Sequence, residues 1–256
     1  MGAFEVTATT TRDGVQVDEI SFEVSSEDRG SAYFLQNRTE DARPLVVAFH
    51  DGRGSRSDLL GEVETLAAKG HRCLAIDSPR MREAMGVRDH LAALTAAVTV
   101  GRAAIDAVRG LPQIDPQRIG LMGRGMGGEA AAVVAIDTTG VRVVAIAGAL
   151  PRRGRFLASD HAIADAARLM LGDDAVARMV DGLTPLELIP ALVAREDITW
   201  MLQLGDDDDR FDDDDRRELI YDIPQTVRIA RHATWAELGR FHARQERIDL
   251  LHRVLR

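Results

Sequence analysis

The fold is decided by one stretch, Asp115-Pro116-Gln117-Arg118-Ile119-Gly120-Leu121-Met122-Gly123-Arg124-Gly125-Met126-Gly127-Gly128. Its apolar run, Ile119–Met122, has the length of a buried strand. Four closely spaced glycines follow, and the small-residue segment Glu129–Val133 after them has helical character. The sequence therefore predicts a strand that enters a tight, glycine-rich turn and a helix that leaves it.

Further strands are predicted on both sides of this turn. The apolar runs of strand length are Leu45–Phe49, Cys73–Ile76, Val141–Ile146, Ile198–Leu204 and Thr226–Ala230. Segments 57–69 and 89–110 have helical periodicity and lie between such runs. Unbroken apolar runs suit strands that are buried on both faces, so their alternation with helices predicts a mostly parallel, doubly wound α/β sheet.

The ends of the pattern add a hairpin and an insertion. Val15–Val24 partly alternates and follows the turn pair Asp13-Gly14, which predicts an antiparallel edge hairpin. Residues 151–197 are too long for a simple crossover and are predicted to form a helical cap, in which Thr184-Pro185-Leu186-Glu187 begins a helix. We expect residues 1–256 to form one domain that includes this cap.

The glycine-rich turn resembles the nucleophile elbow of the α/β-hydrolase family, G-x-S-x-G, in the form Gly123-Arg124-Gly125-Met126-Gly127. Within that family, the small esterases related to dienelactone hydrolase are the most similar group. The resemblance implies an α/β-hydrolase fold and hydrolysis of an ester, thioester or amide, but Gly125 stands at the position of the nucleophilic serine. The stretch also matches the dinucleotide fingerprint G-x-G-x-x-G. That match is the weaker one, because the turn lies mid-chain and no acidic residue stands about twenty positions later.

The segment Val46–Ser55 resembles the oxyanion loop of the same family, which follows a strand with the pattern H-G-x-x-G. The resemblance implies that the backbone N–H groups of Gly52 and Met126 form the oxyanion hole. Asp51 replaces the usual glycine, and its carboxylate would repel an oxyanion if it pointed inward. Together with Asp51, we expect three neighbouring side chains to contact the substrate, namely His50, Arg53 and Arg124.

The family's acid and histidine follow the elbow in the expected order. Leu202–Asp208 resembles the strand that ends in G-x-x-D, which places Asp208 at the acid position. Its neighbours are also Asp, so a shift of one or two residues stays open, and most of the eight Asp in 206–215 are expected to be solvated. His232 closely follows the last predicted strand and is the expected histidine, with His242 as the alternative.

Composition excludes several classes of function. A net charge of −9 argues against a nucleic-acid partner, because phosphates need a basic surface. The apolar runs are too short for a membrane span, and the first residues lack the pattern of a secretory signal. Cys73 is the single cysteine, which fits a reducing, cytoplasmic location. We expect no cofactor, no metal and a small-molecule substrate, and leave a homodimer open.

Three functions remain open for a chain with Gly125 at the elbow. In the first case, the chain is a serine hydrolase whose nucleophilic serine was replaced by design. In the second case, it is a natural relative that lost the serine. A relative without the serine would catalyse a cyclisation, elimination or aldol-type step with a histidine base and the oxyanion hole. In the third case, the chain is a binding or interaction protein that kept the fold.

Overall fold

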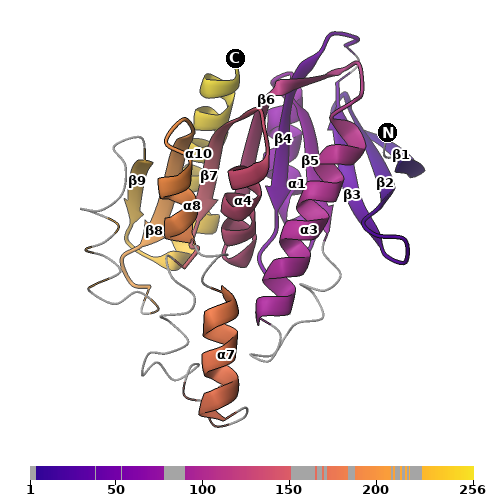
Figure 1. Ribbon diagram of the computed structural model, residues 1–256. Helices are drawn as coiled ribbons and strands as arrows, with labels where there is room; N and C mark the ends of the chain where they lie inside the picture. Colours follow the sequence, from indigo (N-terminus) through magenta and orange to yellow (C-terminus); the bar gives the residue numbers. More distant parts are fainter. Residues whose placement is uncertain are drawn as a thin grey trace.

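The computed structural model describes residues 4–37, 39–52, 54–77, 90–150, 165, 169, 172–183, 188–208, 210, 214, 217, 219 and 227–256. These residues contain a sheet of nine strands in the order β1-β2-β3-β5-β4-β6-β7-β8-β9. Strands β3 to β9 form its larger part, and β1 and β2 extend it at the N-terminal edge (Figure 1).

The N-terminal edge is antiparallel. β1 (Phe4–Arg12) and β2 (Val15–Glu23) form the predicted hairpin, with Arg12 opposite Val15. Both turn residues, Asp13 and Gly14, have positive φ (48° and 81°), as a two-residue hairpin turn requires. β3 (Arg29–Gln36), which the sequence pattern did not indicate, pairs antiparallel with both β2 and β5.

The remaining strands run parallel to one another. They are β4 (Arg43–Phe49), β5 (Arg72–Asp77), β6 (Ile114–Arg124), β7 (Val141–Ala147), β8 (Thr199–Gly205) and β9 (Val227–His232). Each overlaps one of the apolar runs predicted as strands. Their parallel pairing brings the carboxyl ends of all six to one edge of the sheet, where ligands of open α/β sheets bind.

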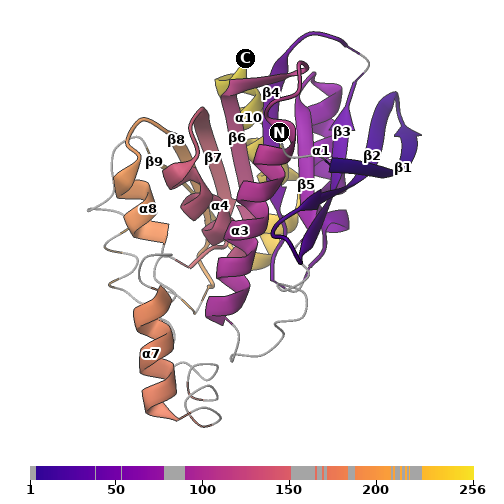
Figure 2. The ribbon, with the colours of Figure 1, turned by 45° about the vertical axis from the view of Figure 1, so that its right-hand side comes forward.

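Helices cover both faces of this sheet (Figures 1 and 2). On one face, α3 (His90–Val108), α4 (Met126–Asp137) and α8 (Leu188–Ala194) cover a core that includes Leu45, Val47 and Phe49 of β4. On the other, α1 (Leu60–Ala68) and α10 (Phe241–Leu255) cover a second core with Val46 and Ala48. Alternate residues of β4 therefore enter the two cores, as a strand buried on both faces requires.

The predicted cap is only partly described. Of residues 151–197, α7 (Asp173–Leu183) and α8 are helical, whereas the predicted helix start at 184–187 lies outside the described residues. α7 lies beyond the carboxyl ends of the strands in both ribbon views (Figures 1 and 2).

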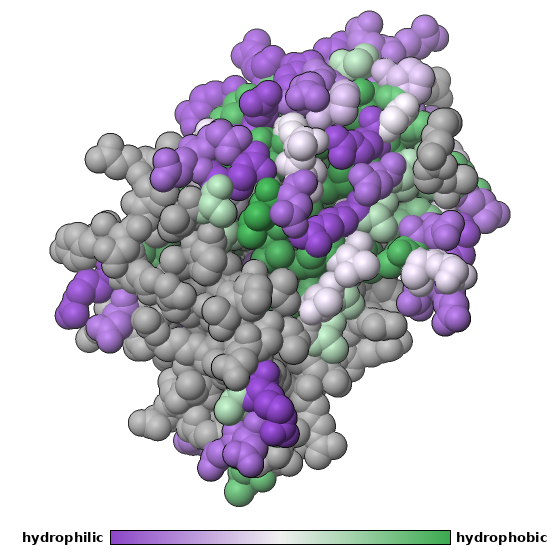
Figure 3. Space-filling view, viewed as in Figure 1, coloured by the Kyte–Doolittle hydropathy of each residue, from purple (hydrophilic) through white to green (hydrophobic). Residues whose placement is uncertain are grey.

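The surface of the face with α3 and α4 is mixed. Figure 3 shows that hydrophilic side chains surround small apolar areas over its described upper part. Among the described residues, no helix combines the length and the apolar character that a membrane crossing needs.

Candidate active site

The glycine-rich turn joins the end of β6 to the start of α4. Gly125 lies between them with φ 50° and ψ −127°, a conformation that residues with a side chain rarely adopt. Its N–H donates to the Ala147 carbonyl on β7 (2.9 Å), and its carbonyl accepts from the Gly128 N–H (2.9 Å). The local backbone is thus a strained turn between a strand and a helix, as the sequence predicted at this position.

The flanking glycines are required by close packing. A Cβ on Gly123 would lie 2.6 Å from the Gly127 carbonyl carbon, and one on Gly127 would lie 2.6 Å from the Phe49 carbonyl oxygen. A Cβ on Gly128 would lie 2.5 Å from Cγ2 of Ile146. The first turn of α4 therefore lies directly against the ends of β4, β6 and β7.

The space in front of Gly125 is filled by the side chain of Asp51. A Cβ on Gly125 would lie 2.7 Å from Cγ of Asp51 and closer still to its Oδ1. The same Oδ1 accepts a hydrogen bond from the Gly52 N–H (2.7 Å). A carboxylate from the loop after β4 therefore occupies the place that a side chain at position 125 would take.

The two residues that were predicted to supply the oxyanion donors, Gly52 and Met126, lie next to each other. A Cβ on Gly52 would contact the side chain of Met126, with Sδ at 3.7 Å. Met126 is the first residue of α4, where backbone N–H groups have no acceptor within the helix. Because the Gly52 N–H is engaged by Asp51, a substrate oxygen would have to displace that carboxylate to reach both donors.

His50 lies behind this loop and is buried, with 2% of its surface exposed. Its Nδ1 lies 2.6 Å from the Asp51 carbonyl oxygen, and its Nε2 lies 3.1 Å from Oδ1 of Asp77 at the end of β5. The ring links the ends of two neighbouring strands, and its burial leaves little surface for the substrate contact that the sequence predicted. Arg53, the next predicted contact, lies outside the described residues.

Asp208 is buried near the end of β8, and the guanidinium of Arg210 binds it. Arg210 Nε lies 2.7 Å from Oδ1 of Asp208, and Arg210 Nη2 lies 2.6 Å from Oδ2. Arg210 Nη2 also donates to the Gly148 carbonyl (3.3 Å), and its guanidinium lies 5.7 Å from the centre of the Trp235 ring. Burial acts to lower the pKa of Arg210, but hydrogen bonds to Asp208 and the attraction of Asp208, Glu129 and Asp51 raise it.

The structure does not bring the predicted histidines to Asp208. His232, the last residue of β9, has its Nε2 3.4 Å from Oε2 of Glu246 on α10. His242 is 85% exposed, and its Nε2 lies 3.5 Å from the other oxygen of Glu246. Glu246 also accepts from Nε2 of Gln203 (2.8 Å). Within the described part of the chain, both histidines therefore face a carboxylate on the C-terminal helix, and an Asp208–His232 pair is not present.

Arg124 precedes Gly125, and its guanidinium extends toward the short helix η4 (Trp235–Gly239), where a Cβ on Gly239 would lie 3.2 Å from Nη2. Burial, followed by the charge of Arg247, lowers the pKa of Arg124, whereas Glu62 and Asp51 act against this. Within the described residues, its guanidinium makes no hydrogen bond or ion pair. It is therefore a positive group near the elbow that can still accept an anionic partner.

The sequence analysis missed several buried charges of this region. Glu129, in the first turn of α4, is 1% exposed and accepts from the Leu150 N–H (3.1 Å). Arg247 of α10 is fully buried and binds Glu62 of α1 through two guanidinium nitrogens (2.9 and 3.0 Å to Nη2, 3.1 Å to Nε). The only sequence signal for such a pair is a charged residue at a helix position where the apolar periodicity expects a buried one.

The described residues contain no group of three or more His, Cys, Asp or Glu side chains placed to hold a metal ion. Part of the run of Asp residues lies outside the described residues, so this finding covers only its described members.

Comparisons with known proteins agree with this architecture. No model of a protein family matches the chain. The quorum-quenching protein AidA of Acinetobacter baumannii is 31% identical over 105 residues, which are 41% of this chain and 34% of AidA. The chain thus spans about a third of the length of this curated relative.

Solved structures match nearly the whole chain. Acetyl xylan esterase 1 from Thermoanaerobacterium sp. has a TM-score of 0.68 at 16% identity and covers 98% of this chain and 88% of its own. A cold-adapted esterase from an Arctic intertidal metagenomic library has a TM-score of 0.67 at 14% identity, with coverage of 99% and 100%. A dienelactone hydrolase-like promiscuous phosphotriesterase from metagenomic libraries has a TM-score of 0.62 at 14% identity, with coverage of 95% and 100%. The chain therefore has the α/β-hydrolase fold that these esterases share.

Proposed function

We propose that the protein hydrolyses an ester, thioester or amide bond of a small molecule at the Gly125 elbow, with Asp51 as a general base. The observation that carries the proposal is the position of Asp51, whose carboxylate fills the space of the missing nucleophile side chain. Matching solved structures that are esterases support the class of bond.

Asp51 has one oxygen available for this role. Oδ1 is held by the Gly52 N–H, whereas Oδ2 accepts no hydrogen bond from the described residues. A carboxylate oxygen in this position can take a proton from a water molecule while the resulting hydroxide attacks the substrate carbonyl. The oxyanion of the tetrahedral intermediate then accepts a hydrogen bond from the Met126 N–H. When the intermediate collapses, it expels the alcohol, thiol or amine, which takes the proton back from Asp51. No covalent enzyme intermediate forms.

The glycine at position 125 is compatible with this position of the Asp51 carboxylate. A serine at position 125 would need Asp51 to turn away from Gly52, because its Cβ would overlap the carboxylate. This overlap supports a chain that evolved with a carboxylate at the elbow over a serine hydrolase whose nucleophile was replaced by design.

The test compares two carboxylates with p-nitrophenyl acetate as the probe. We expect Asp51→Asn to lower kcat/KM by roughly 10²–10⁴-fold, the usual contribution of a general base. Asp106→Asn on the exposed surface of α3 is the matched control and should leave kcat/KM unchanged. The wild-type protein should show no burst phase, since no acyl-enzyme accumulates. Equal activity of wild type and Asp51→Asn would contradict the role of Asp51.

A binding protein that kept the fold is the second candidate. It is favoured by the pairing of Asp208 with Arg210 and of His232 with Glu246, because the predicted acid and histidine then do not pair with each other as a triad requires. Wild-type protein that is folded but hydrolyses no faster than buffer would favour this candidate. A serine-free catalyst of a cyclisation, elimination or aldol-type step would use the same Asp51 base on a carbon acid, and Asp51→Asn tests that role too.

A further inference from the structure

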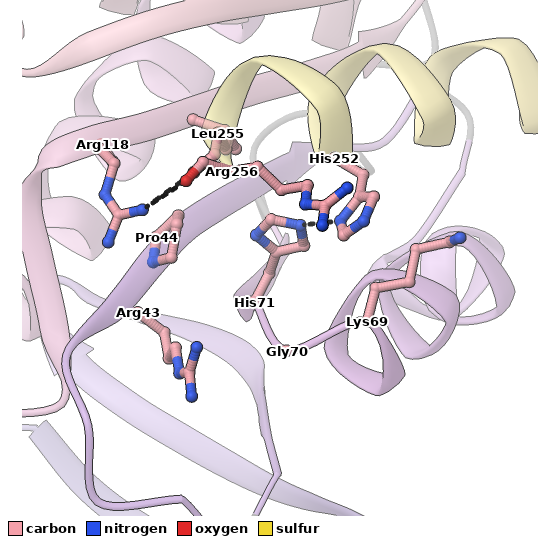
Figure 4. Close-up of a pocket in the computed structure, with 9 residues that line it drawn as sticks. All are labelled: Arg43, Pro44, Lys69, Gly70, His71, Arg118, His252, Leu255 and Arg256. Carbon is pink, nitrogen blue, oxygen red and sulfur yellow. Dashed lines mark hydrogen bonds between the residues drawn. The ribbon is translucent and has the colours of Figure 1, made fainter.

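A cavity lies at the opposite edge of the sheet from the elbow, where the parallel strands begin. It has a volume of about 440 Å³, and its charged or titratable lining residues are Arg43, Lys69, His71, Arg118, His252 and Arg256. Figure 4 shows Arg43 and Arg118 on one side of it, Lys69 on the other and the two histidines between them. The cavity is therefore lined by cationic groups in a protein whose net charge is −9.

The positive charge of this lining is only partly compensated. Arg43 pairs with Asp41 (3.1 Å), and Arg118 pairs with Asp115 (2.7 Å) and donates to the main-chain oxygens of Leu255 and Arg256. The ammonium group of Lys69 has no ion pair within the described residues. At least one full positive charge of the lining is thus without a carboxylate partner among the described residues.

Two buried polar atoms of the lining, Nδ1 of His71 and Nε of Arg43, have no hydrogen-bond partner among the described residues. His71 is only 3% exposed, so water reaches its ring poorly. In Figure 4, the nitrogen of His71 that does not face His252 points toward the side of Arg43 and Arg118. An unpaired buried polar atom costs about 1–3 kcal/mol, which a ligand with acceptor oxygens would recover.

The two histidines form a relay that can supply the missing donor. Nε2 of His71 lies 2.9 Å from Nδ1 of His252, so one ring donates and the other accepts. When His252 donates, the proton of a neutral His71 sits on Nδ1, which then donates into the cavity. A ligand that accepts hydrogen bonds selects this arrangement.

The surrounding charges bias both histidines toward their neutral forms. Burial lowers the pKa of His71 to about 4, and the charges facing it act in the same direction: His252 on α10, Arg118 on β6, Lys69 after α1 and Arg43 on β4. Burial, Lys69 and Arg256 lower the pKa of His252, and Asp249 acts against them. Negative charge in the cavity would reverse these effects and favour protonation of the pair.

We propose that this cavity binds a small divalent oxyanion of the phosphate class, held by Arg43, Arg118 and the Nδ1 of His71, with Lys69 adding positive charge to the lining. Arginine and lysine recognise such anions through charge-assisted hydrogen bonds, and the cavity is large enough for a phosphate group with a small substituent. The site lies apart from the elbow and does not depend on the hydrolase proposal.

Sulfate is the first probe, because it stays divalent between pH 5 and pH 8. We expect saturable binding of sulfate by calorimetry at an ionic strength held constant with chloride. The affinity should increase as the pH falls from 8 toward 5, because bound anion favours protonated His71 and His252. Inorganic phosphate and glycerol phosphate should compete with sulfate at pH 7.

Lys69→Gln is the variant of choice because Lys69 is exposed and its replacement leaves the core intact. It should weaken sulfate binding by about two- to fivefold at low ionic strength, the effect of removing one unpaired positive charge from the lining. The matched control is Arg178→Gln on the exposed surface of α7, which removes one positive charge far from the cavity and should bind like wild type.

Three results would overturn the proposal. The first is that sulfate and phosphate bind no more tightly than chloride, and the second is that Lys69→Gln binds sulfate like the wild type. The third is that the protein binds only to vesicles that contain phosphatidic acid and not to the free anions. Hydrolysis of p-nitrophenyl acetate should be the same in Lys69→Gln and wild type, so failure here and failure of the elbow proposal are separate observations.

Discussion

The predicted elbow around Gly125 and the predicted acid and histidine, Asp208 and His232, lie at the same edge of the sheet, but the structure agrees with the two predictions to different degrees. Around Gly125, the backbone has the predicted strained turn, and the loop after β4 lies against it. After β8 and β9, the strand ends are in place, but Asp208 binds Arg210 and His232 faces Glu246.

The two regions differ in the kind of contact that fixes their geometry. The elbow is fixed by contacts between backbones, in which glycines allow α4 to approach β4 and β6. Those contacts are part of the core, so losing them would destabilise the whole fold. Asp208 and His232, by contrast, lie at or just after the ends of strands and are held by side-chain contacts. Such side chains can exchange partners at little cost to the stability of the fold. We infer that the backbone of such a site outlasts its side-chain chemistry.

The largest effect is expected for Gly127→Ala. Its Cβ would overlap the carbonyl groups of Phe49 and His50, which are backbone atoms and cannot move aside as a side chain could. We expect a loss of about 3 kcal/mol or more in the free energy of unfolding, measured by urea denaturation. Gly61→Ala in α1 is the control, since nothing lies within 4 Å of its added Cβ and helix propensity favours alanine by about 0.5–1 kcal/mol. Equal effects of the two substitutions would contradict the packing of the elbow.

An intermediate effect is expected for Gly125→Ser, which combines backbone strain with overlap on Asp51. The strain alone costs about 1–3 kcal/mol. The double variant Gly125→Ser with Asp51→Gly removes the overlap and should be the more stable of the two in urea denaturation. Neither should react with a fluorophosphonate probe, because no histidine among the described residues is paired to activate the hydroxyl. Labelling of either protein at position 125 would show that the histidine region can still supply a base.

The smallest effect is expected for His232→Gln. In a serine hydrolase, loss of the histidine removes the general base, whereas here His232 contacts Glu246 away from the elbow. We therefore expect kcat/KM for p-nitrophenyl acetate to change by less than about twofold, against roughly 10²–10⁴-fold for a general base. A loss of two orders of magnitude would mean that His232 reaches the elbow during the reaction.

The sequence predicted the backbone of this molecule better than its side-chain contacts. Unbroken apolar runs located the six parallel strands, and Asp13-Gly14 located the hairpin turn, because burial on two faces and positive φ leave direct signals in residue type. β3 was missed because Arg29–Gln36 has a weak pattern, although Phe34 and Leu35 are buried.

In the candidate site, too, the backbone was predicted better than the side-chain contacts. The glycines at 123, 127 and 128 signalled close backbone approach, and the structure has it. Asp51 was noted as an unfavourable neighbour of an oxyanion, but its position in front of Gly125 depends on a side-chain rotamer that no local pattern encodes. The partner of His232 could not be found from sequence, because Glu246 lies on a different element fourteen positions later and only the packing of α10 brings the two together.

The topology of the sheet also has a consequence for the order of folding. The hairpin of β1 and β2 joins residues that are adjacent in the chain, so it can close within about 1–10 μs. β4 lies between β5 and β6, so its seven residues pair with segments that begin about thirty and seventy positions later. Such distant parallel pairs form slowly, because the entropy of closing long loops is lost before the contacts form. We expect the N-terminal strands to acquire protection from hydrogen exchange before the centre of the sheet, which nevertheless becomes the most protected part of the native protein.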